Sequence, residues 1–302
     1  MIESWVWITI FGAFFQNLRS ALQKKATNNL STLGASYTRF LFALPFAIIY
    51  LVFLNGYLGY LIPTPSTKFF FYCVAGGAAQ IIFTILLISL FEQRNFAVGT
   101  VFSKTELVQV AIFGFLILGE PLTMNEFFAL LVTAFGVVML ALKDIGKSSS
   151  GIVKSLFNIS TIWGLGSGAA LGLSVVLFRA AALSLEYDGG FVMPAAFTLV
   201  IALTVQSICL GIIIQVREQE TIPRMFFRWK DSLGVGIAGV IASIAWFTAF
   251  TMHSAAQVRA VGQIELVFTF LASVLIFKEK SSILEVFGMT LILVGIIFMV
   301  AS

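Results

Sequence analysis

The chain contains one apolar stretch twice, and this duplication constrains its fold more than any other feature. Residues 102–140 align with residues 261–299 without a gap, so every matched pair lies 159 positions apart. Apolar helices resemble one another by composition alone, but acidic residues are rare in such segments, and here they match in register. The matched acidic pairs are Glu106 with Glu265, Glu120 with Glu279, and Glu126 with Glu285. We infer that the chain consists of two related halves.

The composition indicates that much of the surface faces lipid. Of the 302 residues, 59% are hydrophobic and 11% are charged, whereas a soluble chain carries about 25% charged residues. Too few polar side chains are available to cover a soluble globule. Cys73 and Cys209 both lie inside apolar runs, so neither a disulfide framework nor a metal site is expected. The net charge of +4 does not indicate a nucleic-acid partner.

The apolar residues fall into ten segments, each close to the roughly 20 residues that cross a bilayer. Backbone polar groups in lipid must be satisfied within the segment, so each run is predicted to be a helix. Residues 217–231 form the most charged predicted loop. The predicted helices are Ser4–Ala26, Leu33–Leu54, Phe69–Phe91, Ala97–Leu118, Met124–Leu142, Thr161–Leu183, Phe191–Val216, Leu233–His253, Gln257–Phe277 and Ile283–Ala301.

Five predicted helices precede the linker at residues 143–160 and five follow it. An odd number of crossings per repeat makes the second copy enter the membrane in the opposite sense, as in secondary transporters with inverted repeats. We therefore predict an all-α polytopic membrane protein with ten transmembrane helices in two inverted five-helix repeats. The first repeat spans residues 1–142 and the second spans residues 161–302.

The ends of the two halves carry a resemblance to a known family. The first half has Leu118-Gly-Glu-Pro-Leu-Thr before Phe135-Gly-Val-Val-Met-Leu, and the second has Phe277-Lys-Glu-Lys-Ser-Ser before Val294-Gly-Ile-Ile-Phe-Met. With two five-helix repeats, this pattern resembles the EamA-type transporters of the drug/metabolite transporter superfamily. The resemblance implies a carrier of small metabolites such as amino acids, sugar phosphates or nucleotide sugars. It does not identify the cargo.

Glu106 and Glu265 are the leading candidates for the transport site. Each follows the predicted helix start by about ten residues, which is roughly 15 Å at 1.5 Å per residue. A carboxylate near the middle of the hydrocarbon costs roughly 3 kcal/mol and usually marks a pathway or a proton relay. The alternative is structural: each carboxylate is paired with a cation, or is neutral and hydrogen-bonded between helices.

Other polar and aromatic residues in the predicted helices complete the candidate site. Glu106 and Gln109 share a helix face, whereas Lys104 points away from Glu106. Lys104 is either part of the site or extends towards the nearer membrane boundary. Arg39 is a candidate clamp for a substrate anion or a partner for Glu106. The full set of substrate or coupling candidates is Glu106, Glu265, Lys104, Arg39, Gln109, Gln263, Asn17, Gln80, Trp163 and Trp246.

Two glycine patterns are interpreted as packing surfaces. Gly234-x-Gly-x-x-Gly239 fits a dinucleotide fingerprint but lies in an apolar helical run with no strand before it. Gly164, Gly168 and Gly172 recur at the spacing that lets two helices approach closely. No catalytic motif and no ATP-binding motif is present in the sequence, so an enzyme, a cofactor or ATP-driven transport is not expected.

The basic residues predict an orientation. Opposite the basic-rich set of loop residues, only Lys68 and Arg259, with Arg179 nearby, are available. The positive-inside rule then places the rich set in the cytoplasm and both termini outside a plasma (bacterial inner) membrane. The rich set is Lys24, Lys25, Arg94, Lys143, Lys147, Lys154, Arg217, Arg224, Arg228, Lys230, Lys278 and Lys280.

The predicted function is secondary, non-ATP transport of small metabolites by alternating access, with amino acids as the first candidates and protons as the coupling ion. The expected partners are a small-molecule substrate and the lipid bilayer, with a monomer or a homodimer as the assembly. One alternative is an exchanger of phosphorylated or nucleotide-linked sugars, which needs a basic cluster. The other is a non-transporting membrane scaffold.

Overall fold

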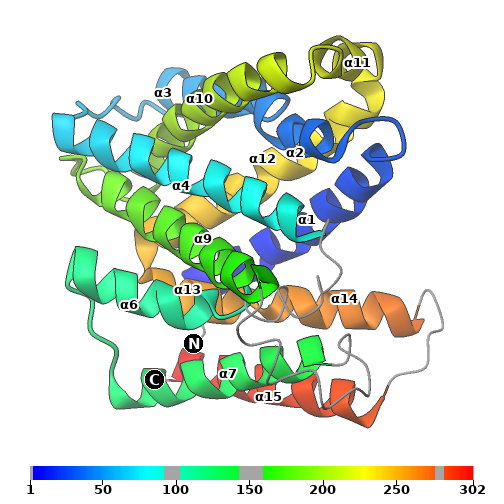
Figure 1. Ribbon diagram of the computed structural model, residues 1–302. Coiled ribbons are helices and arrows are strands. Elements are labelled where there is room, and N and C mark those ends of the chain that lie inside the picture. The colour runs from blue at the N-terminus through cyan, green and yellow to red at the C-terminus, as the bar shows by residue number, and fades with distance from the viewer. Residues whose placement is uncertain (1–2, 92–102, 143–158, 276–281, 302) are drawn as a thin grey trace. The chain divides into compact units, whose positions relative to one another are not determined.

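The structure is a computed structural model that describes residues 3–91, 103–142, 159–275 and 282–301, and this part of the chain contains helices and no strands (Figure 1). The predicted linker lies outside the described residues except for its last two positions, which begin a helix. The helices are α1 (Ser4–Ala26), α2 (Thr32–Leu41), α3 (Leu44–Gly56), α4 (Thr67–Phe91), α6 (Glu106–Leu118), α7 (Met124–Leu142), α9 (Ile159–Leu183), α10 (Val192–Arg217), α11 (Thr221–Phe227), α12 (Trp229–Met252), α13 (Ala255–Gly262), α14 (Ile264–Leu275) and α15 (Ile283–Ala301).

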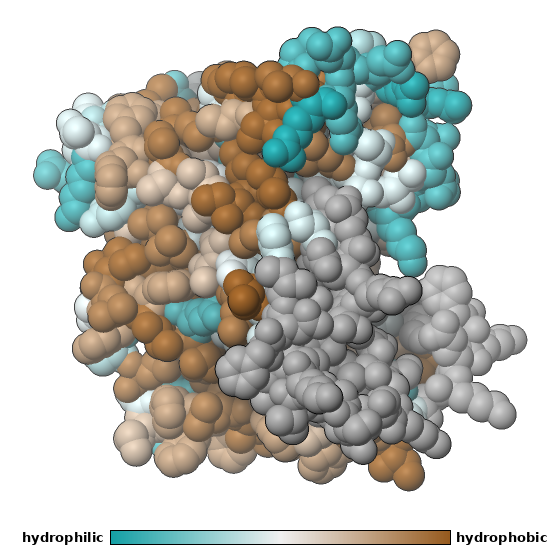
Figure 2. All heavy atoms as spheres, in the orientation of Figure 1, coloured by the Kyte–Doolittle hydropathy of each residue, from teal (hydrophilic) through white to brown (hydrophobic). Residues whose placement is uncertain are grey.

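The described helices have the length and surface of a polytopic membrane protein. Six helical segments are long and apolar enough to span a bilayer, and α6 and α7 are shorter apolar helices. Large apolar side chains are exposed along most helices, and hydrophilic residues gather over α11 (Figure 2). The six segments are Thr32–Gly56, Thr67–Leu87, Thr161–Leu183, Val192–Arg217, Trp229–Met252 and Ile283–Ala301.

The chain packs into two compact units, and each unit takes helices from both sequence repeats. Unit 1 contains residues 82–176 and 254–302, and therefore α6, α7, α13, α14 and α15. Unit 2 contains residues 3–81 and 177–253, and therefore α1, α2, α3, α10, α11 and α12. Helices α4 and α9 each contribute one part to unit 1 and the other part to unit 2.

Within unit 1, the equivalent helices α7 and α15 pack against each other along their length (Figure 1). A Cβ on Gly136 would lie 2.7 Å from the carbonyl oxygen of Gly288, and a Cβ on Gly295 would lie 3.0 Å from that of Ala129. These two contacts are related by the duplication, because Gly136 matches Gly295 and Ala129 matches Gly288. Positions rise along α7 as they fall along α15, so the two helices run antiparallel.

Two predicted helices are interrupted in the structure. The segment predicted as Leu33–Leu54 is divided at Phe42 and Ala43, just before Pro45, whose ring cannot fit inside a continuing helix. The segment predicted as Gln257–Phe277 is divided at Gln263. The sequence predicted one helix for each segment, and the structure divides each of them by a short turn, although residues 32–56 still form one span long enough to cross a bilayer. Hydropathy shows where a segment is apolar and not where its hydrogen-bond ladder breaks.

The break at Gln263 has a counterpart in the first repeat. Gln263 matches Lys104, and α6 begins immediately after a turn at Lys104 and Thr105. The predicted helix start at residues 97–102 lies outside the described residues. A turn therefore precedes Glu106 and Glu265 at the same place in both repeats.

The region 217–231, predicted to be a loop, contains the short helix α11. Its charged residues face outward, and Arg224 forms an exposed ion pair with Glu220 one turn earlier, at 2.6 Å. Met225 is fully buried and attaches this segment to unit 2. A short amphipathic helix whose buried residues are Thr221 and Met225 has no long apolar run that the sequence could reveal.

Gly168 and Gly172 of one glycine pattern and Gly236 of the other pack closely, as predicted. A Cβ on Gly168 would lie 2.7 Å from the carbonyl oxygen of Ser103, and one on Gly172 would lie 3.0 Å from Val110, so α9 lies against α6 in unit 1. In unit 2, a Cβ on Gly236 would lie 2.5 Å from the Cβ of Phe42. These glycines permit helix approach, as in other membrane helix pairs.

We expect Gly136→Ala to destabilise the protein, although alanine has the higher helix propensity by about 1 kcal/mol. The added methyl group meets backbone atoms of α15, which cannot rotate away, and overpacking of this kind costs about 1–3 kcal/mol. Gly56→Ala is the control, because a Cβ there meets nothing within 4 Å. Thermal unfolding of both variants in nanodiscs tests this, and equal melting temperatures would contradict the packing described.

Candidate functional site

A buried ion pair lies at the centre of the polar residues in unit 1. Arg259 on α13 donates from Nη2 to Oε1 of Glu106, the first residue of α6. The two side chains are 8% and 4% exposed, respectively. Removing one partner of such a pair leaves an uncompensated charge in a medium of low dielectric constant, which is strongly unfavourable. The pair therefore fastens the start of α6 to α13.

Glu265 lies beside this pair, at the second position of α14. Its carboxylate interacts electrostatically with Arg259, and its side chain is partly buried. One guanidinium thus acts on both of the glutamates that the duplication relates. The duplication supplies no second arginine, because Thr100 occupies the position that matches Arg259.

Gln263 lies at the break between α13 and α14, between Arg259 and Glu265 in the sequence. Its Nε2 donates to the carbonyl oxygen of Arg259 at 3.3 Å, which fixes the orientation of the amide because a carbonyl only accepts. The Oε1 atom is then left as an acceptor, and it has no hydrogen-bond partner in the described part of the chain. The residue is 1% exposed.

The other unit 1 candidates surround α6. Gln109 donates to the Thr105 hydroxyl at 3.1 Å. Its Oε1 would lie 3.1 Å from a Cβ on Gly168, and the backbone nitrogen of Glu106 would lie 3.3 Å from the same point. The Gln109 side chain and the backbone at Glu106 therefore lie against α9, whereas the Glu106 carboxylate is bonded to Arg259 on α13. Trp163 is partly buried on α9.

Lys104 lies in the turn that precedes Glu106 and is partly buried. It forms no hydrogen bond or ion pair with any residue that the structure describes. The cation bonded to Glu106 is Arg259, whereas the sequence candidate for that role was Arg39. Position in the sequence could not reveal this, because Arg259 appeared to be one of the few basic residues at a membrane boundary.

Four of the sequence candidates belong to unit 2. Gln80 on α4 accepts a hydrogen bond from Gln206 on α10. Trp246 on α12 is buried and stacks on Phe250, with ring centroids 5.5 Å apart. Asn17 is partly buried on α1.

Arg39 is the fourth of these, and its environment is basic. Its guanidinium lies 4.4 Å from the centroid of the Phe40 ring and interacts electrostatically with Arg19 on α1. A Cβ on Gly239 would lie 3.5 Å from both the Arg19 side chain and the Arg39 carbonyl oxygen, which places the two arginines on the same part of α12. Sequence analysis did not select Arg19.

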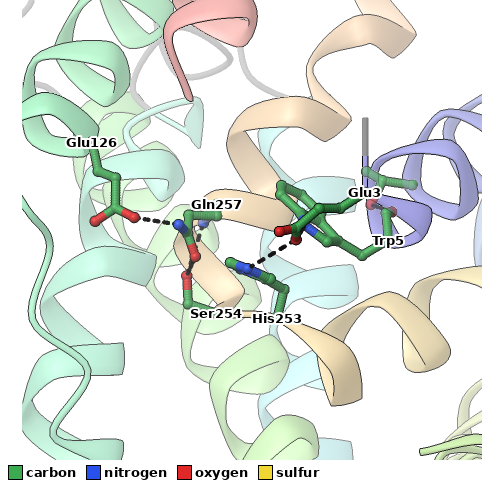
Figure 3. Close-up of polar contacts among 7 residues, drawn as sticks. Glu3, Trp5, Glu126, His253, Ser254 and Gln257 are labelled. Atoms are coloured by element: carbon green, nitrogen blue, oxygen red, sulfur yellow. Dashed lines mark hydrogen bonds and ion pairs between the residues drawn. The ribbon is translucent and has the colours of Figure 1, made fainter. Parts of the chain in front are cut away.

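Arg179 was interpreted as a boundary residue, but the structure buries it. It is 9% exposed and donates to the carbonyl oxygen of Phe250. His253 ends α12, as predicted; its ring stacks on Trp5 at 4.4 Å and its Nε2 lies 3.8 Å from Oε2 of Glu3 (Figure 3).

The duplicated pair Glu126 and Glu285 has a structural role that explains its match. The backbone nitrogen of Thr123 donates to Glu126 at 2.7 Å, and that of Ser282 donates to Glu285 at 2.7 Å. The hydroxyls of Thr123 and Ser282 accept bonds in return, at 3.2 and 3.3 Å, so both helices start with a capping box. Glu126 also accepts a bond from Gln257 on α13 (Figure 3).

We expect Arg259→Gln to destabilise the protein by about 3–5 kcal/mol, because it leaves buried carboxylates without their cation. The double variant Glu106→Gln/Arg259→Gln should recover part of this loss, since it removes the buried carboxylate that is bonded to Arg259 and leaves only the partly buried Glu265 without the cation. Glu220→Gln is the control, because the exposed pair with Arg224 is worth about 0–1 kcal/mol. Thermal and urea unfolding measure these differences, and a double variant no more stable than Arg259→Gln would contradict the ion pair.

Comparison with known proteins assigns the chain to a family. The model of the EamA-like transporter family matches residues 3–142 and 158–301. A solved structure described as "Crystal structure of protein" has a similar fold, with a TM-score of 0.73 over 99% of this chain and 96% of that chain, at 14% sequence identity. A search of curated proteins gave no match. Since the family match extends over both repeats, the protein is a membrane protein that belongs to the EamA-like transporter family, within the drug/metabolite transporter superfamily.

Proposed function

We propose that the protein is a secondary carrier of small polar metabolites in the plasma membrane, with amino acids as the first candidates. The proposed mechanism is alternating access coupled to protons. Membership of a transporter family supports transport. The observation that carries the proposal further is the charged group at Glu106, Arg259 and Glu265, because charged residues inside a membrane bundle usually serve a pathway or a relay.

The proposed architecture is ten helices in two inverted five-helix repeats. The antiparallel packing of the equivalent helices α7 and α15 supports an inversion. Matching turns at Lys104 and Gln263 support a site between the repeats, because interrupted helices at equivalent positions usually contribute to the substrate and ion sites of such carriers.

We assign different roles to the two glutamates. Glu106 is held by Arg259 and keeps α6 attached to α13. Glu265 is the proposed coupling site, since it is partly buried and shares the same arginine. Lys104, in the turn that precedes Glu106, is proposed to bind the carboxylate of a substrate.

An exchanger of phosphorylated or nucleotide-linked sugars is the second candidate. It is favoured by the proximity of Arg39 to Arg19, because paired guanidinium groups suit phosphate oxygens. Arg179 adds little to the basic cluster that an exchanger needs, because its guanidinium is buried and donates to the Phe250 carbonyl oxygen.

The proposed orientation places both termini outside. Arg259 belongs to a buried ion pair, so it no longer counts among the boundary charges of the basic-poor side, and the asymmetry becomes larger. We expect a C-terminal tag to be cleaved by protease added to intact cells. A tag that is cleaved only after permeabilisation would reverse the orientation.

Flux from proteoliposomes tests the function. We expect a mixture of labelled amino acids to move with a pH gradient, and Glu265→Gln to abolish that gradient-dependent flux while leaving folded protein in the membrane. Glu285→Gln is the matched control, because it changes the glutamate at a duplicated helix start where glutamine also completes a capping box.

The outcomes separate the alternatives. Undiminished flux in Glu265→Gln would contradict the coupling role but keep the carrier. Flux of phosphorylated sugars in the absence of amino-acid flux would favour the exchanger. No flux of either class would favour the scaffold that the sequence also allowed.

A further inference from the structure

One end of unit 2 is rich in basic side chains, and every residue of this unit from 3 to 81 and from 177 to 253 is described. Two segments meet at this end, residues 24–32 and residues 217–231. The Asn29 amide donates to Asp231 at 3.2 Å and the Ser31 hydroxyl donates to Glu218, so the two segments lie side by side. They contain three acidic residues, Glu218, Glu220 and Asp231, and six basic residues, Lys24, Lys25, Arg217, Arg224, Arg228 and Lys230.

The three carboxylates of this surface are already bonded within the unit. Asp231 and Glu218 accept hydrogen bonds from neutral side chains, and those to Glu218 include one from the Thr221 hydroxyl at 2.8 Å. Glu220 forms an ion pair with Arg224 at 2.6 Å. All six basic residues are exposed. The surplus of positive charge therefore lies on the surface of the unit.

The opposite end of unit 2 has the reverse balance. The other ends of α1, α3, α10 and α12 lead to residue 3 and to residues 56–68, 183–192 and 253. The charged residues there are Glu3, Lys68, Glu186 and Asp188, together with His253. The basic surface is therefore a property of one end of the unit, next to α11, and not of the whole unit.

Exposed aromatic side chains lie among these basic residues. Phe226, Phe227 and Trp229 are 56%, 83% and 49% exposed, respectively. The Nζ atom of Lys230 lies 5.8 Å from the centroid of the Trp229 ring. Both α10 and α12 are long and apolar enough to span a bilayer, so the short segment between them lies near the membrane surface. Aromatic side chains beside Lys and Arg are typical of segments that lie in the headgroup region.

Packing within unit 2 fixes the position of this surface. Met225 is fully buried, and a Cβ on Gly34 would lie 2.5 Å from the Cγ2 atom of Thr221. The ring centroids of Phe226 and Phe42 are 5.8 Å apart. These contacts attach α11 to α2 and to the turn before α3, so the exposed side chains that adjoin it keep a fixed arrangement (Figure 2).

We propose that this surface binds the headgroups of anionic phospholipids. Arg224, Arg228 and Lys230 bind the phosphate groups, and Phe227 and Trp229 enter the headgroup region. Lys and Arg beside a membrane span are attracted by a negatively charged leaflet. A lipid fits better than a soluble anion, because a soluble anion would leave the aromatic side chains in water, whereas the lipid interface covers them.

Electron paramagnetic resonance of spin-labelled lipids tests the proposal with the full chain in phosphatidylcholine vesicles. It measures the association constant of labelled phosphatidylglycerol relative to that of phosphatidylcholine with the same acyl-chain label. We expect the wild type to prefer phosphatidylglycerol. Arg228→Gln and Lys230→Gln should each reduce this preference, roughly twofold to fivefold, because each removes one positive charge near the membrane surface. Sodium chloride should weaken the preference by screening.

Two further variants distinguish lipid binding from a loss of folding. Glu220→Gln removes a negative charge and releases Arg224 from its ion pair, so it should raise the preference for phosphatidylglycerol. Lys68→Gln is the matched control for Lys230→Gln, because the Nζ atom of Lys68 lies 5.7 Å from the centroid of the Tyr72 ring at the acidic end of the unit. It should change the preference less than Lys230→Gln does.

Three results would overturn the proposal: no preference in the wild type, an equal loss in Lys68→Gln and Lys230→Gln, or no gain in Glu220→Gln. A competition series adds glycerol phosphate at constant ionic strength. A preference that survives this addition supports the lipid, and one that is abolished would assign the surface to a soluble phosphate and also overturn the proposal.

The inference is independent of the proposed transport, because none of these residues belongs to the proposed transport site. A protein that moves no solute but keeps the lipid preference and its response to the variants would retain this surface and lose the carrier. A protein that moves solute without a lipid preference would retain the carrier and lose this surface.

Discussion

The bond between Arg259 and Glu106 is the interaction on which unit 1 most depends, because neither charge can remain alone in an apolar interior. Both side chains are nearly inaccessible to solvent, so the free energy of solvation that each has lost must be replaced by the other. This requirement fixes the start of α6 against α13. It also makes the pair sensitive to any further charge, and Glu265 supplies one from the next helix.

The helix between Arg259 and Glu265 is interrupted at Gln263, and this break bears on the proposed transport site. A continuous helix would hold the two residues at fixed separation, and their electrostatic interaction could change little. The turn at Gln263 interrupts the regular backbone hydrogen bonds of the helix. The side-chain Oε1 atom of Gln263 is a buried acceptor without a hydrogen-bond partner in the described part of the chain. Matching turns in the two repeats place this feature at the same point in each copy, although Arg259 is present in only one. The two repeats thus have matching turns before their glutamates. Only the second repeat has an arginine at the position of Arg259, since the first has Thr100 there, so the charged groups of the two repeats differ.

Small residues provide the second constraint. Gly136, Gly288 and Gly295 allow backbone contact between α7 and α15, and Gly168 and Gly172 allow it between α9 and α6. In lipid, apolar side chains gain little from association, so close contact between backbones and interhelical hydrogen bonds determine which helices meet. Gly168 and Gly172 consequently bring α9 against the start of α6, next to the Glu106 backbone and Gln109.

The sequence determined that the chain is an apolar, helical, duplicated membrane protein, because composition, segment length and a repeat in fixed register are properties of the chain itself. It also selected Glu106 and Glu265 as unusual and the glycines of α9 as a packing surface. Only the tertiary structure showed that Arg259, 153 positions after Glu106, is the cation bonded to it. It also showed that Glu126 and Glu285 cap helices, and that predicted continuous helices break at Gln263 and before Pro45. These features depend on which side chains meet across helices and on local hydrogen bonding, and hydropathy contains neither.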